Sequence, residues 1–201
     1  KAAPLKAVVK EMTDAGYDAK GWVLDLMDET AIGRVFLEIG EHFGEIDILV
    51  NNAGISMFAP IDSEDYGIAW SKSMAVLLTA HTLTIRAALP YMRKSAHARI
   101  VNIASTEGLG ATKYGSPYTA AKTGVIGLTR SLAIELGPEN ITVNCVCPGP
   151  INTGMTSAIA DGDKVVFAKR RTALRRYGAP EEVAHGTLGL VLPASQYITG
   201  V

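Results

Sequence analysis

The sequence predicts an α/β fold in which a doubly wound parallel sheet carries helices on both faces. Short β-branched runs alternate with helical periods along the chain, and the strand-like runs are apolar on both sides. Polar motifs follow the ends of these runs, where ligands of such sheets bind. With 201 residues, of which 48% are hydrophobic, the chain is long enough to bury a sizeable core. We therefore expect a single domain over residues 1–201.

The expected elements alternate between helix and strand. Helices are assigned where apolar residues recur at helical spacing, and strands where short runs are rich in valine and isoleucine. Pro90 is expected to stop or kink the third helix near its end, and Ser116 with Pro117 opens the fourth. In chain order we expect a helix at 5–12, a strand at 21–26, a helix at 32–43, a strand at 46–50, a helix at 64–92, a strand at 99–105, a helix at 116–137 and a strand at 141–146.

Tyr118 and Lys122 are the strongest chemical signal in the chain. They stand one helical turn apart in the run YTAAK and so share a helix face, where the ammonium can lower the pKa of the phenol. A phenol tuned in this way can exchange protons near neutral pH. Ser105, which ends a strand, can supply a hydroxyl that polarises a carbonyl at the same point. Together these residues indicate carbonyl and alcohol redox chemistry, and the alternative is a solvated pair on a helix surface.

Polar motifs fall at the carboxyl ends of all four expected strands, which predicts a single site. Asp25, Asn51 and Ser105 end the first three strands, and Pro148 and Gly149 follow the fourth. Asn51 opens the run NNAG and is expected to tie the central strands together through side-chain hydrogen bonds. The alternative for NNAG is a simple turn.

The order of these motifs resembles that of the short-chain dehydrogenase/reductase family. NNAG follows the apolar run IDILV, Ser105 precedes Tyr118 at the family's spacing, YTAAK opens a long helix, and VNCVCPGPINT follows at 143–153. The resemblance implies a Rossmann-like fold and an oxidoreductase that uses NAD or NADP to interconvert a secondary alcohol and a ketone. It also implies that Tyr118 exchanges the proton, that Lys122 holds the nicotinamide ribose as well, and that Ser105 orients the substrate oxygen.

The resemblance assigns further residues to the cofactor. Asp25 and the Leu26 amide are expected to bind adenine, and the alternative for Asp25 is an N-cap of the following helix. Ala53 and Gly54 lack bulk, so their backbone can approach the adenine ribose closely. The loop after the last strand is expected to hold the nicotinamide carboxamide. The complete expected cofactor set is Asp25, Leu26, Asn51, Ala53, Gly54, Tyr118, Lys122, Pro148, Gly149, Ile151 and Thr153.

The chain departs from the family pattern at two places. The glycine-rich turn that binds phosphate is absent, and Leu77 stands where the family usually has an asparagine that binds a water linked to the catalytic lysine. For a strand order of 3-2-1-4-5-6, the runs at 21–26 and 46–50 are strands three and four, and strands one and two belong between them. We therefore expect the first β-α-β unit, roughly 30 or more residues, to precede Lys1. The competing interpretation is a non-catalytic relative that serves as a structural or regulatory subunit.

Residues 152–178 mix glycine, small residues and charge, which suits a lid over the substrate. The basic run of this segment could recognise an anionic substrate, although a solvated helix face explains the run more simply. Glu107 lies two residues past Ser105 and is expected to line the substrate pocket with Ser105 and Tyr118, and the alternative is an exposed loop carboxylate. The basic residues are Lys169, Arg170, Arg171, Arg175 and Arg176.

Charge and cysteine content limit the expected partners. The formal net charge is -1, so no global field attracts nucleic acid or an anionic membrane, and we expect neither. Cys145 and Cys147 are too close in sequence for an ordinary bridge, which favours buried thiols. No apolar run reaches the roughly 20 residues of a membrane span, and the first residues lack the apolar core of a signal peptide, so we expect a reducing cytoplasm. The histidines lack metal-ligand spacing, and no metal is expected. The expected partner is a small-molecule alcohol or ketone.

The family resemblance also implies a homodimer or homotetramer. The helices at 64–92 and 116–137 are expected to pair with their copies in a second subunit. Small residues allow helices to approach closely, and the alternative is that they pack against the chain's own sheet. The small residues of the second helix are Ala120, Ala121, Gly124 and Gly127.

Overall fold

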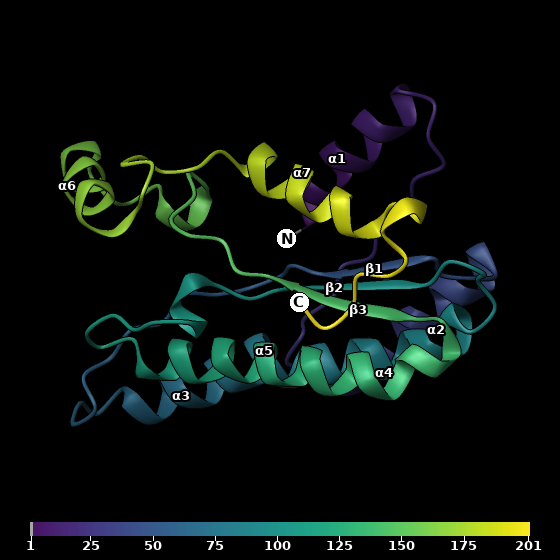
Figure 1. The fold of residues 1–201 in the computed structure, drawn as a ribbon, viewed down its shortest axis with the longest axis horizontal. Coiled ribbons are helices and arrows are strands. Elements are labelled where there is room, and N and C mark those ends of the chain that lie inside the picture. The colour runs from purple at the N-terminus through teal and green to yellow at the C-terminus, as the bar shows by residue number, and fades with distance from the viewer. Residues whose placement is uncertain (1) are drawn as a thin grey trace.

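Three parallel strands form the centre of the computed structural model, which describes residues 2–201. β1 (Ile48–Asn51), β2 (Arg99–Ile103) and β3 (Thr142–Val146) lie in that order. Helices cover the sheet on both faces (Figure 1). The predicted parallel α/β architecture is therefore confirmed.

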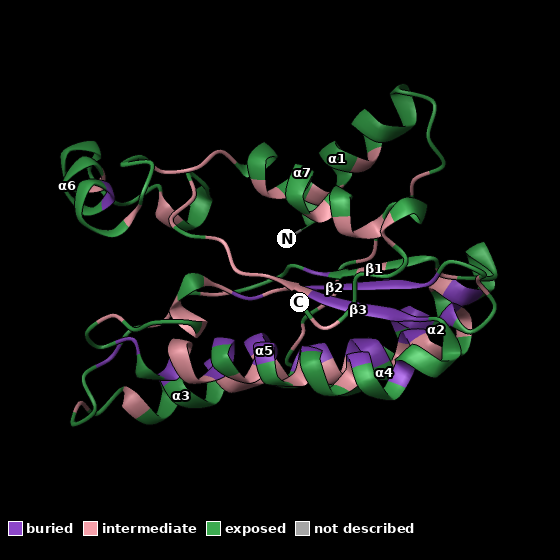
Figure 2. Cartoon of the chain, in the orientation of Figure 1, coloured by how far each residue is buried: buried purple, intermediate pink, exposed green. Residues whose placement is uncertain are grey.

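One helical layer contains α2 (Glu29–Phe43), α3 (Tyr66–Met74), α4 (Ala80–Met92) and α5 (Ser116–Leu136). Figure 2 shows that the faces which α4 and α5 turn to the sheet are buried. Large apolar side chains fill this space, and each fully buried one contributes about 1.5–3 kcal/mol. The main core includes Ile32, Phe36, Ile85, Met92, Ile100, Leu136, Ile141 and Val143.

The other face carries α7 (Pro180–Val191), which contacts β2 and β3, and α1 (Ala2–Asp14) lies on the same side in Figure 1. Neither helix has a fully buried residue among those that the structure describes. The core therefore lies mainly between the sheet and the layer of α4 and α5. Within the described residues, every helix is too short or too polar to cross a membrane.

The starts of α2 and α5 follow the rules of helix capping. The Asp28 carboxylate accepts a hydrogen bond from the Ala31 amide (2.9 Å), which satisfies one free donor of the first turn of α2. Pro117 occupies the first turn of α5, where a backbone N–H is not needed. α5 therefore begins at the predicted residue and carries Tyr118 and Lys122 in its first two turns.

The helix predicted over residues 64–92 is divided into three pieces. A π-helical segment, Ala75–Thr79, separates α3 from α4. Apolar residues continue at three- and four-residue spacings through this segment, so the sequence pattern gave no sign of the wider turn. Pro90 lies in the last turn of α4, which continues to Met92. Such π segments occur frequently at functional sites.

The strand predicted at 21–26 is wrong, because this stretch is irregular. Gly21 packs against α1 so closely that a Cβ there would lie 2.8 Å from Leu5 Cδ1. Trp22 Nε1 donates a hydrogen bond to Glu38 on α2 (2.9 Å). An apolar run becomes a strand only where another strand's backbone lies beside it, and none of the described strands does so.

The outer edge of β3 is occupied by residues 198–201. The Gly200 amide donates to the Val143 carbonyl (2.8 Å), and the Cys145 amide donates to the Val201 carbonyl (2.7 Å). These bonds satisfy backbone groups of β3 that β2 does not reach.

A buried chain of polar side chains joins the strands to the helices beneath them. Asn51 Nδ2 on β1 donates to Asn102 Oδ1 on β2 (3.0 Å), and Asn102 Nδ2 donates to Thr129 Oγ1 on α5 (3.0 Å). Thr84 Oγ1 on α4 donates to Asn51 Oδ1 (2.7 Å). All four residues are buried. The expectation that Asn51 ties the central strands together is therefore confirmed.

We expect Asn102→Leu to lower the free energy of unfolding by about 2 kcal/mol or more, because it leaves the buried Asn51 amide without its acceptor. Urea denaturation measures this change. The exposed Asn152→Leu is the control and should change stability by less than about 0.5 kcal/mol. Equal effects of the two substitutions would show that the buried chain of hydrogen bonds does not stabilise the sheet.

Candidate active site

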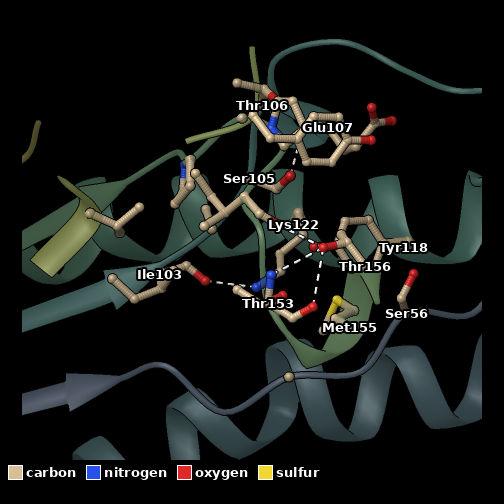
Figure 3. Close-up of a pocket in the computed structure, with 18 of the residues that line it drawn as sticks. Ser56, Ile103, Ser105, Thr106, Glu107, Tyr118, Lys122, Thr153, Met155 and Thr156 are labelled. Carbon is tan, nitrogen blue, oxygen red and sulfur yellow. Dashed lines mark hydrogen bonds between the residues drawn. The ribbon is translucent and has the colours of Figure 1, made fainter. Parts of the chain in front are cut away.

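One cavity of about 1450 Å³ opens at the carboxyl ends of the three strands. Loops after β1, β2 and β3 and the first turns of α5 contribute to its wall. Figure 3 shows Ser105, Tyr118 and Lys122 facing one another there. The predicted residues that line it are Gly54, Ser105, Glu107, Tyr118, Lys122, Pro148, Gly149, Ile151 and Thr153.

Lys122 is a buried lysine at the wall of this cavity. Its Nζ donates to the Ile103 carbonyl at the end of β2 (2.6 Å) and lies 5.9 Å from the centroid of the Tyr118 ring. Burial lowers the pKa of Lys122 to about 8, although Cys145 and Cys147 act in the opposite direction. The ammonium can therefore lose its proton more easily than a lysine in water can.

The prediction that Lys122 lowers the pKa of Tyr118 is wrong for this geometry. Burial raises the pKa of Tyr118, a hydrogen bond with the Ser105 side chain lowers it, and the charge of Glu107 raises it further. Lys122 is not among these causes, and its ammonium donates to the Ile103 carbonyl instead. Tyr118 is consequently a protonated phenol at neutral pH.

Ser105 is placed by a short turn that packs against α5. Its backbone is extended (φ -170), and its Oγ accepts a hydrogen bond from the Glu107 amide (3.1 Å) at the start of a 3-10 helix, Thr106–Gly108. Gly108 touches α5, where a Cβ would lie 2.8 Å from the Lys122 carbonyl oxygen. Only glycine permits this approach, which brings Ser105 next to Tyr118.

Glu107 lies inside the cavity wall, so the alternative of an exposed loop carboxylate is wrong. Its Oε1 accepts a hydrogen bond from Thr112 Oγ1 (2.8 Å). Its Oε2 is buried and has no partner among the described residues. The carboxylate therefore lies inside the wall, and its charge raises the pKa of Tyr118.

Two neighbouring cavities are lined by residues of the expected cofactor set. Gly54 lines both the main cavity and a neighbouring one of about 680 Å³, and Ala53 lines only the second. A Cβ on Gly54 would lie 3.3 Å from Leu77 Cδ2, so a side chain there would crowd Leu77. Asn51 lies beneath this surface and bonds to Asn102 instead.

Asp25 and Leu26 do not reach either cavity. The Asp25 carboxylate accepts a hydrogen bond from the Met27 amide (2.9 Å), which forms a local turn. The N-cap of α2 is Asp28, so the N-cap alternative for Asp25 is wrong. Asp25 thus makes a hydrogen bond within its own turn and lies apart from the residues that line the two cavities.

Sequence reasoning missed several apolar residues of the cavity. The Phe58 ring stacks on Tyr118, with centroids 6.1 Å apart and planes inclined by 19°. Phe58 lies in a loop, where no periodic pattern marks it, and only the fold brings it to α5. The other missed apolar residues include Ile55, Met155, Ile159, Phe167 and Val183.

The predicted lid segment forms a closed loop. Ile151 and Gly178 pair as a parallel bridge, and the Asn152 amide donates to the Gly178 carbonyl (3.0 Å), which fixes the base of the loop. Within it, α6 (Asp161–Arg171) extends to one end of the molecule (Figure 1). Arg171 Nη2 donates to the Ala111 carbonyl (2.9 Å) and so links α6 to the loop before α5.

The basic run of this segment is exposed, and only part of it faces the cavity. Arg170 and Arg171 line the cavity wall. Arg176 instead pairs with Glu182 at the start of α7 (2.6 Å). The run therefore divides into residues that can meet a ligand and residues that hold the chain together.

Leu77 in the π segment and His81 at the start of α4 are two buried residues one helical turn apart. Leu77 is fully buried and lines the cavity from the π segment. His81, one turn later, is 3% exposed, and its Nε2 has no partner among the described residues. Burial lowers the pKa of His81 to about 4, the charge of Lys122 lowers it further, and a hydrogen bond with the Asn51 backbone opposes them.

Comparison with known proteins shows clear relatives. The family model described as enoyl-(acyl carrier protein) reductase matches residues 2–201. A 3-oxoacyl-(acyl-carrier-protein) reductase from Aquifex aeolicus is 39% identical over 199 residues, which cover 97% of this chain and 78% of that protein. Subunit BbsD of a hydroxy(phenyl)methylsuccinyl-CoA dehydrogenase from Thauera aromatica is 37% identical over 199 residues, 99% of this chain and 79% of that protein. A D-beta-hydroxybutyrate dehydrogenase from Rhizobium meliloti is 41% identical over 130 residues, 64% of this chain and 50% of that protein.

The lowered pKa of His81 predicts a loss of stability in acid. Below pH 6.5 the His81 side chain binds a proton in the unfolded chain, but in the native protein it does so only at about pH 4. The free energy of unfolding therefore decreases as the pH is lowered from 6.5 to 4, by up to about 3 kcal/mol. His81→Leu removes this component, and unfolding titrations from pH 7 to pH 4 should show the variant losing less stability than the parent protein. The exposed His97→Leu is the control. Stability curves that stay parallel for His81→Leu and the parent would contradict the burial argument.

Proposed function

The chain belongs to the short-chain dehydrogenase/reductase family, and we propose that it interconverts a secondary alcohol and a ketone with Tyr118 as proton donor and acceptor. Family membership makes the protein an NAD(P)-dependent oxidoreductase, since the relatives are named as reductases and dehydrogenases. The observation that carries the proposal is the meeting of Ser105, Tyr118 and Lys122 at one wall of the cavity.

The raised pKa of Tyr118 suits a proton donor. A protonated phenol can transfer its proton to the substrate oxygen as negative charge develops there during ketone reduction. Ser105 Oγ, at the end of β2, donates a hydrogen bond to the same oxygen and stabilises that charge. Lys122, whose pKa is about 8, lies on the next turn and can return a proton to Tyr118. In alcohol oxidation the same groups act in reverse.

The residues of the cavity fit the nicotinamide end of the cofactor. Bound NAD or NADP supplies or accepts the hydride. Lys122 presents an ammonium for the ribose, and Ile151 and Thr153 provide backbone and hydroxyl groups for the carboxamide. Gly54 leaves space in the cavity beside Leu77, because a side chain at this position would crowd Leu77. Asp25 and Leu26 stay our proposal for the adenine end.

The lining of the cavity indicates the class of substrate. Phe58 stacks on Tyr118, and Met155 and Phe167 add apolar surface to the same cavity. Arg170 and Arg171 line the cavity from the lid segment. An acyl chain that carries an anionic group satisfies both features. We therefore infer a 3-oxoacyl or 3-hydroxyacyl compound, which agrees with the names of the relatives.

We propose residues 152–178 as a lid over this substrate. The bridge between Ile151 and Gly178 gives the segment a fixed base, so the part between can move as a unit. Its contact with the rest of the cavity wall includes the bond from Arg171 to the Ala111 carbonyl, which is exposed. Closure of such a segment excludes water from the reacting atoms.

The reducing cytoplasm stays our proposal for the location. Cys145 and Cys147 are unbridged, with sulfurs 3.9 Å apart. Burial first, and then the neighbouring Cys147, raise the pKa of Cys145 to about 12, so this thiol stays protonated and unreactive. Neighbouring free thiols of this kind persist where thiols are kept reduced.

Tyr118→Phe should lower turnover by about 10²–10⁴-fold and leave the fold intact, because it removes only the proton donor. Nicotinamide absorbance is followed with NADH and with NADPH on a panel of 3-oxo acids and thioesters, including acetoacetate and acetoacetyl-CoA. The exposed Tyr197→Phe is the matched control and should keep full activity. A Tyr118→Phe variant with more than about half of the parent activity would rule out this mechanism.

We also propose a homodimer or homotetramer formed through the outer faces of α3 and α5. Ala121 and Gly124 pack inside the chain, since Ala121 is buried and a Cβ on Gly124 would lie 2.7 Å from Leu78, so they cannot join subunits. Gly127 has open space around it, and Ile134 on the same helix is 81% exposed. Further exposed apolar residues on this layer are Ile68 and Trp70.

Light scattering at micromolar concentration should therefore give a mass of two or four chains. Ile134→Lys should shift the distribution toward the monomer, because burial of the new charge at the contact is unfavourable. The exposed Leu188→Lys on α7, the opposite layer, is the control and should leave the mass unchanged. A single monomeric species of the parent protein would contradict the proposal.

A further inference from the structure

Phe58 borders the cavity, and the reaction described above gives it no role. It lies in the irregular loop that follows β1 and lines the main cavity. Phenylalanine is usually buried in folded proteins, yet Phe58 is 48% exposed. Because this partly exposed ring borders a cavity, a bound ligand can cover it.

Contacts with the loop before α5 hold Phe58 in place without a ligand. The neighbouring Ala59 is buried, and its amide donates a hydrogen bond to the Tyr114 carbonyl (2.9 Å). Gly115 lies against the ring, where a Cβ would be 2.8 Å from Phe58 Cε1. A side chain at position 115 would therefore displace the ring. Since the ring is already positioned, it loses little conformational freedom when it packs against a ligand.

The Phe58 ring stacks on the proposed proton donor. Its centroid lies 6.1 Å from that of the Tyr118 ring, and the planes are inclined by 19°. In the proposed reaction the substrate oxygen meets the hydroxyl groups of Tyr118 and Ser105, which face one another in Figure 3. A group bonded to the reacting carbon therefore lies next to Tyr118, where the Phe58 ring is an apolar neighbour.

The type of contact that Phe58 offers favours an aromatic group over a saturated one. Two aromatic rings attract each other in offset-stacked or edge-to-face arrangements beyond the effect of the area that they bury. A cyclohexyl group buries a similar area but has no π-system, and a methyl group covers little of Phe58. Phe167 and Tyr177 of the lid segment also line the cavity, with ring centroids 6.2 Å apart, so aromatic side chains border it from two parts of the chain.

The charged residues of the cavity lie on a different segment from Phe58. The loop from Asn52 to Pro60 carries no charged side chain, so it favours an apolar group of the substrate. Arg170 and Arg171 line the cavity from the lid segment, where they can bind an anionic group. A substrate with an apolar ring at one end and an anionic group at the other thus has a partner for each end.

We propose that Phe58 is a specificity-determining residue, and that the reacting carbonyl of the preferred substrate carries an aryl ring that packs against it. The proposal rests on the proposed function and narrows the substrate class to 3-aryl-3-oxoacyl compounds. In their reduction the carbonyl carbon gains the hydride of reduced nicotinamide and the oxygen gains the proton of Tyr118, which gives a benzylic alcohol and oxidised nicotinamide. The aryl ring keeps all its bonds, so Phe58 acts through packing alone.

Three thioesters that differ only in the group on the reacting carbonyl test the preference. They are 3-oxo-3-phenylpropanoyl-CoA, 3-cyclohexyl-3-oxopropanoyl-CoA and acetoacetyl-CoA, and kcat/KM is measured for each by nicotinamide absorbance with NADH and with NADPH. We expect the parent protein to prefer the phenyl compound over the methyl compound by roughly fivefold or more. A parent protein that reduces the cyclohexyl or the methyl compound as efficiently as the phenyl compound would overturn the proposal.

Substitutions of Phe58 separate its contribution from the intrinsic reactivity of each ketone. Phe58→Leu keeps an apolar side chain but loses the ring, and it should lower the phenyl-to-cyclohexyl ratio of kcat/KM roughly fivefold. Phe58→Tyr keeps the ring and should keep the ratio. Phe43→Leu is the matched control, because Phe43 is similarly exposed (43%) but lines neither cavity.

Each ratio is measured on one preparation, so a smaller folded fraction of a variant does not change it. An unchanged ratio in Phe58→Leu, or an equal decrease in Phe58→Tyr, would show that the Phe58 ring does not select the substrate. A similar decrease in Phe43→Leu would contradict the proposal as well, because that side chain lies outside both cavities.

The same assays distinguish this inference from the proposed function. If the parent is inactive on all three thioesters, or if Tyr118→Phe keeps the parent activity, the proposed function fails and the role of Phe58 falls with it. If Tyr118→Phe is inactive but the phenyl-to-cyclohexyl ratio is the same in Phe58→Leu and the parent, only the aryl preference is refuted.

Discussion

The hydrogen bond between Asn51 and Asn102 fixes the framework on which the rest of the structure depends. It joins the ends of β1 and β2 inside the core and continues to Thr84 on α4 and Thr129 on α5. Each of these side chains is buried, so a shift of either helix would leave a polar group unpaired. The network therefore sets where α5 lies against the sheet, and α5 carries the reactive side chains.

Two glycines allow the close packing that positions the site. Gly108 lets the turn after β2 touch the backbone of α5 at Lys122, and Gly124 lets α5 touch Leu78 of the π segment. A methyl group at position 108 would clash with the backbone of α5, and one at position 124 would force the Leu78 side chain to move. The site thus depends on two glycines that take no part in the chemistry.

Burial, more than charge pairing, sets the proton affinities of the site. It raises the pKa of Tyr118, lowers that of Lys122 to about 8 and lowers that of His81 to about 4. All three shifts favour the neutral form, as expected where water is excluded. The phenol and the imidazole are therefore neutral at physiological pH, and Lys122, which lies 5.9 Å from the Tyr118 ring, releases its proton easily.

The sequence by itself determined the parallel α/β class, the start of α5, and the meeting of Ser105, Tyr118 and Lys122, because these follow from local periodicity, capping and the rule that parallel strands end at one edge. Only the tertiary structure decided the π segment at 75–79, the loss of the strand at 21–26, the stacking of Phe58 on Tyr118 and the direction of the Tyr118 pKa shift. Each of these depends on what lies beside a residue in space. A strand needs a partner backbone and a pKa depends on the water removed from around a group, and neither is encoded in the spacing of residues along one chain.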